Sequence, residues 1–307
     1  MSEIVAGVED AASAERILEH ALVEAETTGR ALQVVSAWTL PYWFTDVTGM
    51  ATVPMPVAAN IAQAASENAR DLLSKALVLR SPDAEGVQAT SVAKQGTAGQ
   101  VLVEVSKAAG LVVVGGPGYG EFRSVLLGSA TLHVLHQAPC PVMVVPSSAT
   151  PGRYTRIVIA LDSGGGAASA LRWGLDAARR HCCPAHVVHV QLRNPAPTSA
   201  FAGAPYADQS PECHEWLQAQ LSEAADATVG VPVTTGVLEG SASAAILAEV
   251  GPDDLLVLGS RGHGGFVGLP LGSVAAQCAQ HAQGVVVVVK TGELRLAPAQ
   301  PARKKPA

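Results

Sequence analysis

An internal repeat is the feature that most constrains how this chain can fold. The stretch 96–145 aligns with 240–289 without a gap, so that each residue has a counterpart 144 positions further on. The upstream stretches 4–8 and 157–161 also match. A repeat of this length indicates one folding unit present twice.

Length and composition agree with two globular units. The chain has 307 residues, of which 48% are hydrophobic and only 4% aromatic. Aliphatic cores of this kind suit parallel strands that are buried on both faces. We expect domains at 1–146 and 155–292, joined by a linker at 147–154 and followed by a flexible basic tail at 293–307.

Apolar strands alternate with amphipathic helices in both copies. In the second copy we expect strands at 156–161, 185–190, 231–237, 255–259 and 285–289, with one helix over about 212–228. This order predicts an α/β protein with two tandem Rossmann-like domains. Each domain is expected to hold a mostly parallel five-stranded sheet with helices on both faces.

Three features follow strands in both copies: an acidic residue, a turn with two glycines, and a Gly-Ser pair that opens a helix. They are Asp162, Gly259 with Gly262, and Gly272-Ser273 in the second copy, and Glu9, Gly115 with Gly118, and Gly128-Ser129 in the first. Ligands of open α/β sheets bind at such strand ends. Glycine turns and helix starts present backbone N–H groups to phosphates. Duplication would also copy purely structural glycines, so a nucleotide-free turn remains the alternative.

The spacing Gly-x2-Gly-x9-Gly-Ser, found in both copies, resembles the nucleotide-binding signature of universal stress proteins. The resemblance covers nearly the whole chain, except the linker and the tail. It implies that ATP binds, with or without Mg²⁺, and that the final strands pair the two copies as an intramolecular pseudo-dimer. It further implies a homodimer and an unknown regulatory protein partner.

The residues that the resemblance assigns to ATP lie in both copies, with adenosine toward the acidic residue and the second strand and the phosphates toward the glycines. In the second copy they are Asp162, Val190, Gly240, Gly259, Gly262, Gly272, Ser273 and Val274. In the first copy they are Glu9, Ala37, Gly96, Gly115, Gly118, Gly128, Ser129 and Ala130. Beside the second turn, Arg261 and His263 either offer charge to the phosphates or form a solvated rim.

The first copy departs from the family pattern. Glu9 stands where the family has Asp, Asp10 adds a charge near the anion, and Pro117 removes a backbone donor from the turn. We therefore expect both sites to bind ATP, the first more weakly.

Other motifs carry less information. No Gly-Lys-Ser/Thr loop or Gly-x-Ser-x-Gly elbow accompanies the Gly-Ser pairs. The pairs His133/His136 and Cys278/His281 are not shared between the copies, so no metal site is expected. The run 164–166 is either a second phosphate nest or a flexible helix entry, and the aromatic residues around 38–44 form a lid, an interface or core.

Charge and patterning exclude several partners. The net charge is −6, which disfavours nucleic acid, and no apolar run is long enough to span a membrane. The five cysteines include no CxxC pair, which suggests a reducing cytoplasm.

We interpret the chain as an ATP-binding regulatory protein of the stress response, in which the nucleotide acts as a conformational ligand. It is expected to be at most a weak ATPase. The alternatives are a slow ATP-hydrolysing or adenylylating enzyme and a nucleotide-free scaffold.

Overall fold

The computed structural model describes residues 2–9, 11–40, 55–79, 86–117, 126–164, 166–191, 210–262 and 271–290. The first copy contains β1 (Glu3–Gly7), α1 (Ala11–Thr28), β2 (Leu32–Trp38), α2 (Met55–Leu79), β3 (Ala89–Gln95), α3 (Ala98–Ser106), β4 (Ala109–Gly115), α4 (Ser129–Gln137) and β5 (Val142–Val145). The second contains β6 (Arg156–Leu161), α5 (Ala167–His181), β7 (Ala185–Gln191), α6 (Ser210–Glu223), α7 (Ala225–Thr228), β8 (Val233–Glu239), α8 (Ala242–Glu249), β9 (Asp254–Gly259), α9 (Ser273–His281) and β10 (Val285–Val289).

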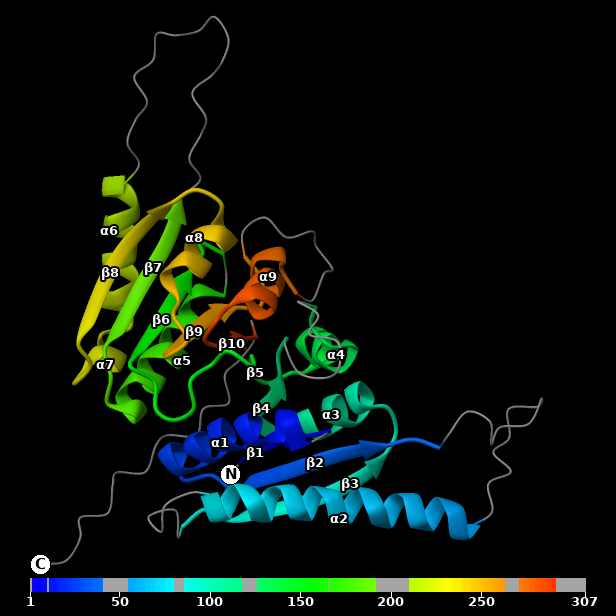
Figure 1. Ribbon diagram of the computed structural model, residues 1–307. Coiled ribbons are helices and arrows are strands. Elements are labelled where there is room, and N and C mark those ends of the chain that lie inside the picture. The colour runs from blue at the N-terminus through cyan, green and yellow to red at the C-terminus, as the bar shows by residue number, and fades with distance from the viewer. Residues whose placement is uncertain are drawn as a thin grey trace, which may run out of the picture.

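All ten strands form one sheet in the order β3-β2-β1-β4-β5-β10-β9-β6-β7-β8. Within each copy the five strands are parallel, and the copies are joined where β10 pairs antiparallel with β5. Figure 1 shows these two strands between the first copy below and the second copy above. The expected fold, two tandem Rossmann-like domains, is confirmed, and the paired final strands make the chain an intramolecular pseudo-dimer.

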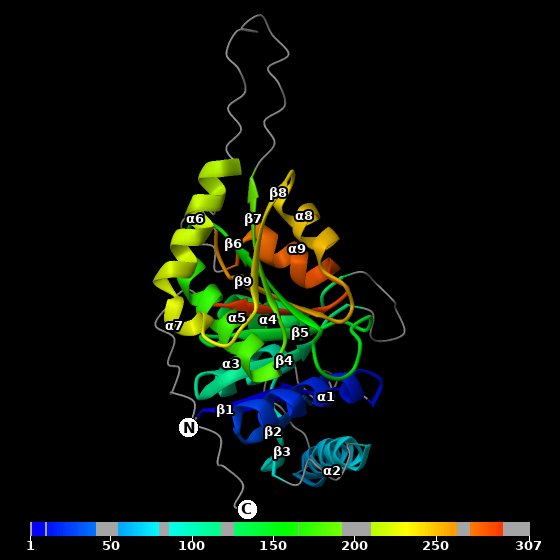
Figure 2. The ribbon, with the colours of Figure 1, turned by 90° about the vertical axis from the view of Figure 1, so that its left-hand side faces the viewer.

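Helices cover both faces of the sheet (Figure 2), and each face has its own apolar core. One core contains side chains from α1, α2, α5, α6 and α7, and the other contains side chains from α3, α4, α8 and α9. The strand β10 shows why, since its five valines are all buried and point alternately into the two cores. A strand with two buried faces requires such a continuous aliphatic run. Both cores extend across the β5–β10 junction, so the two copies share their hydrophobic interior.

The expected helix over 212–228 is wrong in detail, because the structure divides it into α6 and α7. Ala224 has φ −105° and ψ 24°, and its N–H lies 3.2 Å from the carbonyl oxygens of both Gln220 and Leu221. This shared bond tightens the last turn of α6 and ends it.

The segment that joins the copies packs between them. Ala149 and Tyr154 are buried, and Arg16 of α1 donates to the Ala149 carbonyl oxygen. On the other side, the Thr150 N–H donates to the Pro252 carbonyl oxygen over 3.0 Å. The segment is therefore part of the interface between the copies.

A polar cluster lies buried where α1 of the first copy meets α5 of the second. We call it the seam cluster; it consists of His20, Glu24, Tyr154, Arg180 and His181. His181 Nε2 lies 2.9 Å from Glu24 Oε1, and a hydrogen bond of 3.2 Å joins Tyr154 Oη to His20 Nδ1. The Glu24 carboxylate also lies 3.6 Å from the Arg180 guanidinium. Glu24 of the first copy contacts both His181 and Arg180 of the second, so the cluster ties the two copies together.

Candidate functional site

The first copy contains a pocket of about 390 Å³ at the carboxyl edge of the sheet. It lies beyond the ends of β1, β2 and β4, and the start of α4 closes one side. Five of the expected residues line it, namely Glu9, Ala37, Gly115, Gly128 and Ala130. Ser129 opens α4 between Gly128 and Ala130, and Gly118 lies outside the described residues.

Small residues and one hydroxyl build the walls of this pocket. A β-carbon on Gly7 would lie 2.8 Å from Leu102 Cδ1, so glycine at the end of β1 lets α3 approach the strand. The Thr131 hydroxyl donates to the Gly115 carbonyl oxygen over 2.8 Å and holds α4 on β4. Sequence reasoning missed Gly7 and Thr131, because neither belongs to the repeated glycine pattern.

Gly96 and Gly240 are turn residues in equivalent places. Their φ angles are +140° and +117°, which other residues rarely adopt. The Gly96 N–H donates to the Trp38 carbonyl oxygen, and the Gly240 N–H donates to the Gln191 carbonyl oxygen. Turn geometry thus accounts for this matched pair.

In the second copy, three of the expected residues meet around one turn. The Asp162 carboxylate accepts a hydrogen bond of 2.8 Å from the Gly164 N–H, and a β-carbon on Gly262 would clash with the same carboxylate. The Gly272 N–H donates to the Ser260 carbonyl oxygen over 2.7 Å. The end of β6, the turn after β9 and the start of α9 at Ser273 and Val274 are therefore adjacent.

The remaining second-copy candidates lie on the neighbouring elements. Gly259 ends β9, and Val190 is half-buried near the end of β7. Arg261 is exposed in the turn, and His263 lies outside the described residues.

Lys290 is a residue that sequence reasoning missed, and its backbone lies beside this turn because the Ser260 N–H donates to the carbonyl oxygen of the preceding Val289 over 2.8 Å. It follows β10, and its Nζ donates to the Leu135 carbonyl oxygen in α4 of the first copy. Burial lowers the pKa of Lys290 to about 8, and the charge of Arg261 acts in the same direction while Cys140 opposes it. The alignment of the two copies could have identified Lys290, because a lysine stands there where the first copy has Pro146.

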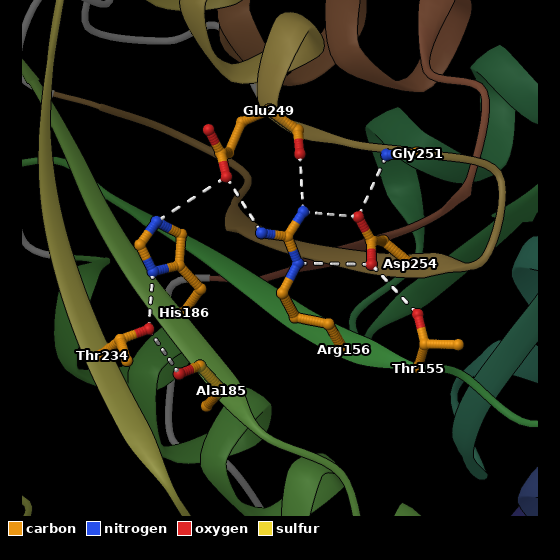
Figure 3. A network of polar contacts seen from close by, with 8 residues as sticks. All are labelled: Thr155, Arg156, Ala185, His186, Thr234, Glu249, Gly251 and Asp254. Atoms are coloured by element: carbon orange, nitrogen blue, oxygen red, sulfur yellow. Dashed lines mark hydrogen bonds and ion pairs between the residues drawn. The ribbon is translucent and has the colours of Figure 1, made fainter.

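A second polar network lies at the opposite, amino edge of the second-copy strands (Figure 3). Arg156 opens β6 and donates to Asp254 over 2.7 Å, to the Glu249 carboxylate over 3.0 Å and to the Glu249 carbonyl oxygen over 2.8 Å. Hydrogen bonding to Asp254 raises the pKa of Arg156, although burial opposes this. The guanidinium is thus engaged by two carboxylates, and we assign the network to stability.

Asp254→Ala is expected to lower the free energy of unfolding by about 2 kcal/mol, because it removes the hydrogen-bond acceptor of both Arg156 and the Gly251 N–H. Chemical denaturation measures the change. The neighbouring Asp253 is exposed, so Asp253→Ala should stay within about 0.5 kcal/mol of the wild type. Equal effects of the two variants would contradict this assignment.

The other candidate motifs do not converge on a site in the part of the chain that the structure describes. No group of three or more metal-ligating side chains occurs there, and none of its helices is long and apolar enough to cross a membrane. Cys182 is exposed in a left-handed conformation, whereas burial raises the pKa of its neighbour Cys183 to about 11. The aromatic residues 42–44 and Gly165 lie outside the described residues.

The fold is that of a protein with two tandem Rossmann-like domains, each with glycine turns at the carboxyl ends of its strands. A model of the universal stress protein family matches residues 1–146 and 153–290. The chain belongs to the universal stress protein family.

Individual relatives agree with this assignment. A universal stress protein of Mycolicibacterium smegmatis is 29% identical over 240 residues, which span 76% of this chain and 81% of the relative. One of Mycobacterium tuberculosis is 27% identical over 62% of this chain and 64% of its own length. The crystal structure of a universal stress protein from Archaeoglobus fulgidus shares the fold, with a TM-score of 0.63 and 18% identity, and the match covers 95% of this chain and 97% of that one.

Proposed function

We propose that the chain binds ATP at the carboxyl edge of its second copy and acts as a regulatory protein of the stress response. One observation carries this proposal: Asp162, the turn at Gly262 and the start of α9 at Gly272 meet in one place. A carboxylate can accept hydrogen bonds from a ribose or adenine, and the turn and helix start offer N–H groups to phosphates. Arg261, which is exposed in the turn, adds positive charge there.

We propose that the chain binds ATP without hydrolysing it. Asp162 supplies the carboxylate of the described turn, and its Oδ1 is already engaged by the Gly164 N–H. That arrangement suits a fixed ligand contact better than a general base, which must reach a water molecule. Any Mg²⁺ would bind chiefly through the phosphate oxygens, since the described residues do not cluster as ligands.

The nucleotide would act by ordering the glycine turns, which changes the surface that a protein partner meets. We also propose a cytoplasmic location, a homodimer, and a division into domains at 1–146 and 155–292, with a linker at 147–154 and a tail at 293–307.

Nucleotide extraction tests this function. Denatured, freshly purified protein should release ATP on chromatography; ADP or AMP would favour the enzymatic alternative, and the absence of any nucleotide would favour the scaffold.

Gly272→Ala is expected to weaken ATP binding about tenfold, as measured by calorimetry. The added methyl group would lie in van der Waals contact with the turn, 3.5 Å from the Ser260 carbonyl oxygen, at the helix start where we propose that the phosphates bind. The matched Gly128→Ala variant should change ATP binding less, because a β-carbon there meets nothing within 4 Å. Equal losses in the two variants would refute a stronger second site.

A further inference from the structure

We propose that Lys290 couples the two copies, so that a nucleotide bound at the second-copy turn also stabilises α4, the helix that lines the first-copy pocket. The inference rests on the proposed function and adds its regulation, because binding in one copy would change the other. The connection consists of hydrogen bonds among described residues in the second copy, one hydrogen bond between the copies, and the short helix α4 itself.

The connection begins at the second-copy turn. The Gly272 N–H, at the start of α9, donates to the Ser260 carbonyl oxygen over 2.7 Å, and the Ser260 N–H donates to the Val289 carbonyl oxygen over 2.8 Å. Val289 ends β10, and Lys290 is the next residue. A ligand that orders the turn and the start of α9 therefore restrains the backbone from which the Lys290 side chain extends.

The Lys290 side chain supplies a hydrogen-bond donor that α4 lacks. A helical carbonyl oxygen accepts from the N–H group four residues further on, and the residue four positions after Leu135 is Pro139, which has no N–H. Lys290 Nζ donates to the Leu135 carbonyl oxygen instead. Although burial lowers the pKa of Lys290 to about 8, the amine stays mostly charged at neutral pH, and a cation at the C-terminal end of a helix is favoured by the helix dipole.

The helix that Lys290 holds also forms one side of the first pocket. Gly128 precedes α4, and Ala130 and Thr131 lie in its first turn; all three line the pocket. The helix has nine residues, which span about 13 Å. A restraint at Leu135, in its last turn, is therefore expected to reach the residues that line the pocket.

The matching positions in the opposite direction lack both features. The first-copy turn makes the same backbone contact, because the Gly116 N–H donates to the Val145 carbonyl oxygen over 2.7 Å. The next residue, however, is Pro146, whose side chain has no donor, and the counterpart of Pro139 is Gln283, which has an N–H. A lysine and a missing N–H thus occur together in one direction only, as expected if the lysine replaces that N–H.

The sign of the coupling follows from this arrangement. A nucleotide that orders the second-copy turn reduces the conformational freedom that Lys290 loses when it holds α4, so that less entropy is lost on ordering the first pocket. Each site should then bind its ligand more tightly when the other is filled, and by the same factor, because coupling between two sites is reciprocal.

Hydrogen exchange followed by mass spectrometry tests the connection. Ala98→Trp places a large side chain in the wall of the first pocket and fills it, so that ATP can contact only the second-copy site. In this variant ATP should slow the exchange of the backbone N–H groups of residues 132–138 about fivefold. Adding Lys290→Met keeps an unbranched side chain but removes the donor and the charge. This second change should abolish the slowing while calorimetry still detects ATP binding.

Two further variants control for the loss of a lysine. Lys107 is exposed after α3, so Lys107→Met in the Ala98→Trp background should leave the slowing unchanged. Lys290→Arg keeps a charged donor and should retain part of it. Slowing of α4 by ATP that persists in Lys290→Met would overturn the inference, and so would ATP bound to Ala98→Trp with no slowing in α4.

A comparison without nucleotide separates this inference from the proposed function. In the otherwise wild-type protein, Lys290→Met should speed the exchange of residues 132–138 about fivefold and leave that of α2, on the other face of the sheet, unchanged. If Ala98→Trp is folded by circular dichroism but binds no ATP, the proposed second-copy site fails. The comparison without nucleotide then decides whether Lys290 holds α4, and unchanged exchange in Lys290→Met would overturn the inference by itself.

Discussion

Replacing His181 by leucine is expected to lower the free energy of unfolding by about 3 kcal/mol. His181 is buried, and its Nε2 lies 2.9 Å from Glu24 Oε1 across the seam between the copies. Without it, the fully buried carboxylate of Glu24 keeps only the longer contact to Arg180. Urea denaturation followed by circular dichroism measures the change. His281 also ends a helix but is exposed, so His281→Leu is the matched control and should cost at most about 0.5 kcal/mol.

A double-mutant cycle separates the lost pair from lost packing. Glu24→Leu should also destabilise the protein, because it removes the partner of His181. The combined Glu24→Leu/His181→Leu variant should recover part of the loss, since an apolar pair fills the same seam and Arg180 keeps its ion pair with Asp176. Strictly additive losses would show that the two side chains do not act as a pair.

Lowering the pH from 6.5 to 4 is expected to decrease the free energy of unfolding by about 3 kcal/mol, because His20 in the same seam takes up a proton. Burial lowers the pKa of His20 to about 4; the charge of Glu24 opposes the shift, whereas Arg16 and His181 add to it. In the unfolded chain His20 titrates near 6.5. The unfolded state thus binds more protons in this interval. The contribution of His20 to the free energy of unfolding is therefore complete above pH 6.5 and is lost as the pH falls toward 4.

Glu24 extends the loss to lower pH. Burial would raise the pKa of Glu24, but the hydrogen bond and charge of His181, with the charges of Arg180 and His20, bring it below 4.5. A carboxylate with a lowered pKa stabilises the fold above its unfolded value and loses that contribution below it.

Urea denaturation at several pH values measures this dependence. His20→Asn keeps a hydrogen-bonding atom near the position of Nδ1 but does not titrate, and it should remove most of the slope between about pH 6.5 and pH 4.5. Burial also lowers the pKa of His186, which is only half-buried. His186→Gln is therefore the comparison variant, and it should change the slope less than His20→Asn does. An unchanged slope in His20→Asn would show that His20 is not the group responsible.

The sequence predicted most of the fold because its signals are local. The valine run at 285–289 is a buried strand, and the helix start at Gly272-Ser273 follows from the repeated spacing. The break at Ala224 was missed because no glycine or proline marks it. For the site, the first pocket includes Glu9, Ala37 and Gly128 as expected, although its ligand remains a proposal.

Contacts between distant residues could not be predicted in this way. Glu24 and His181 lie 157 positions apart and Arg156 and Asp254 lie 98 apart, and no pattern in either stretch identifies the partner. Their pairing depends on how β5 and β10 bring the copies together.

Periodicity and the spacing of small residues suffice to define two α/β units with glycine turns after β3, β4, β8 and β9, because backbone geometry and burial act over a few residues. The merging of the two sheets, the buried charges at the seam and the hydrogen bond from Lys290 to Leu135 arise from packing between the copies. Such contacts depend on three-dimensional complementarity, which residues far apart in the chain achieve only when both units are folded.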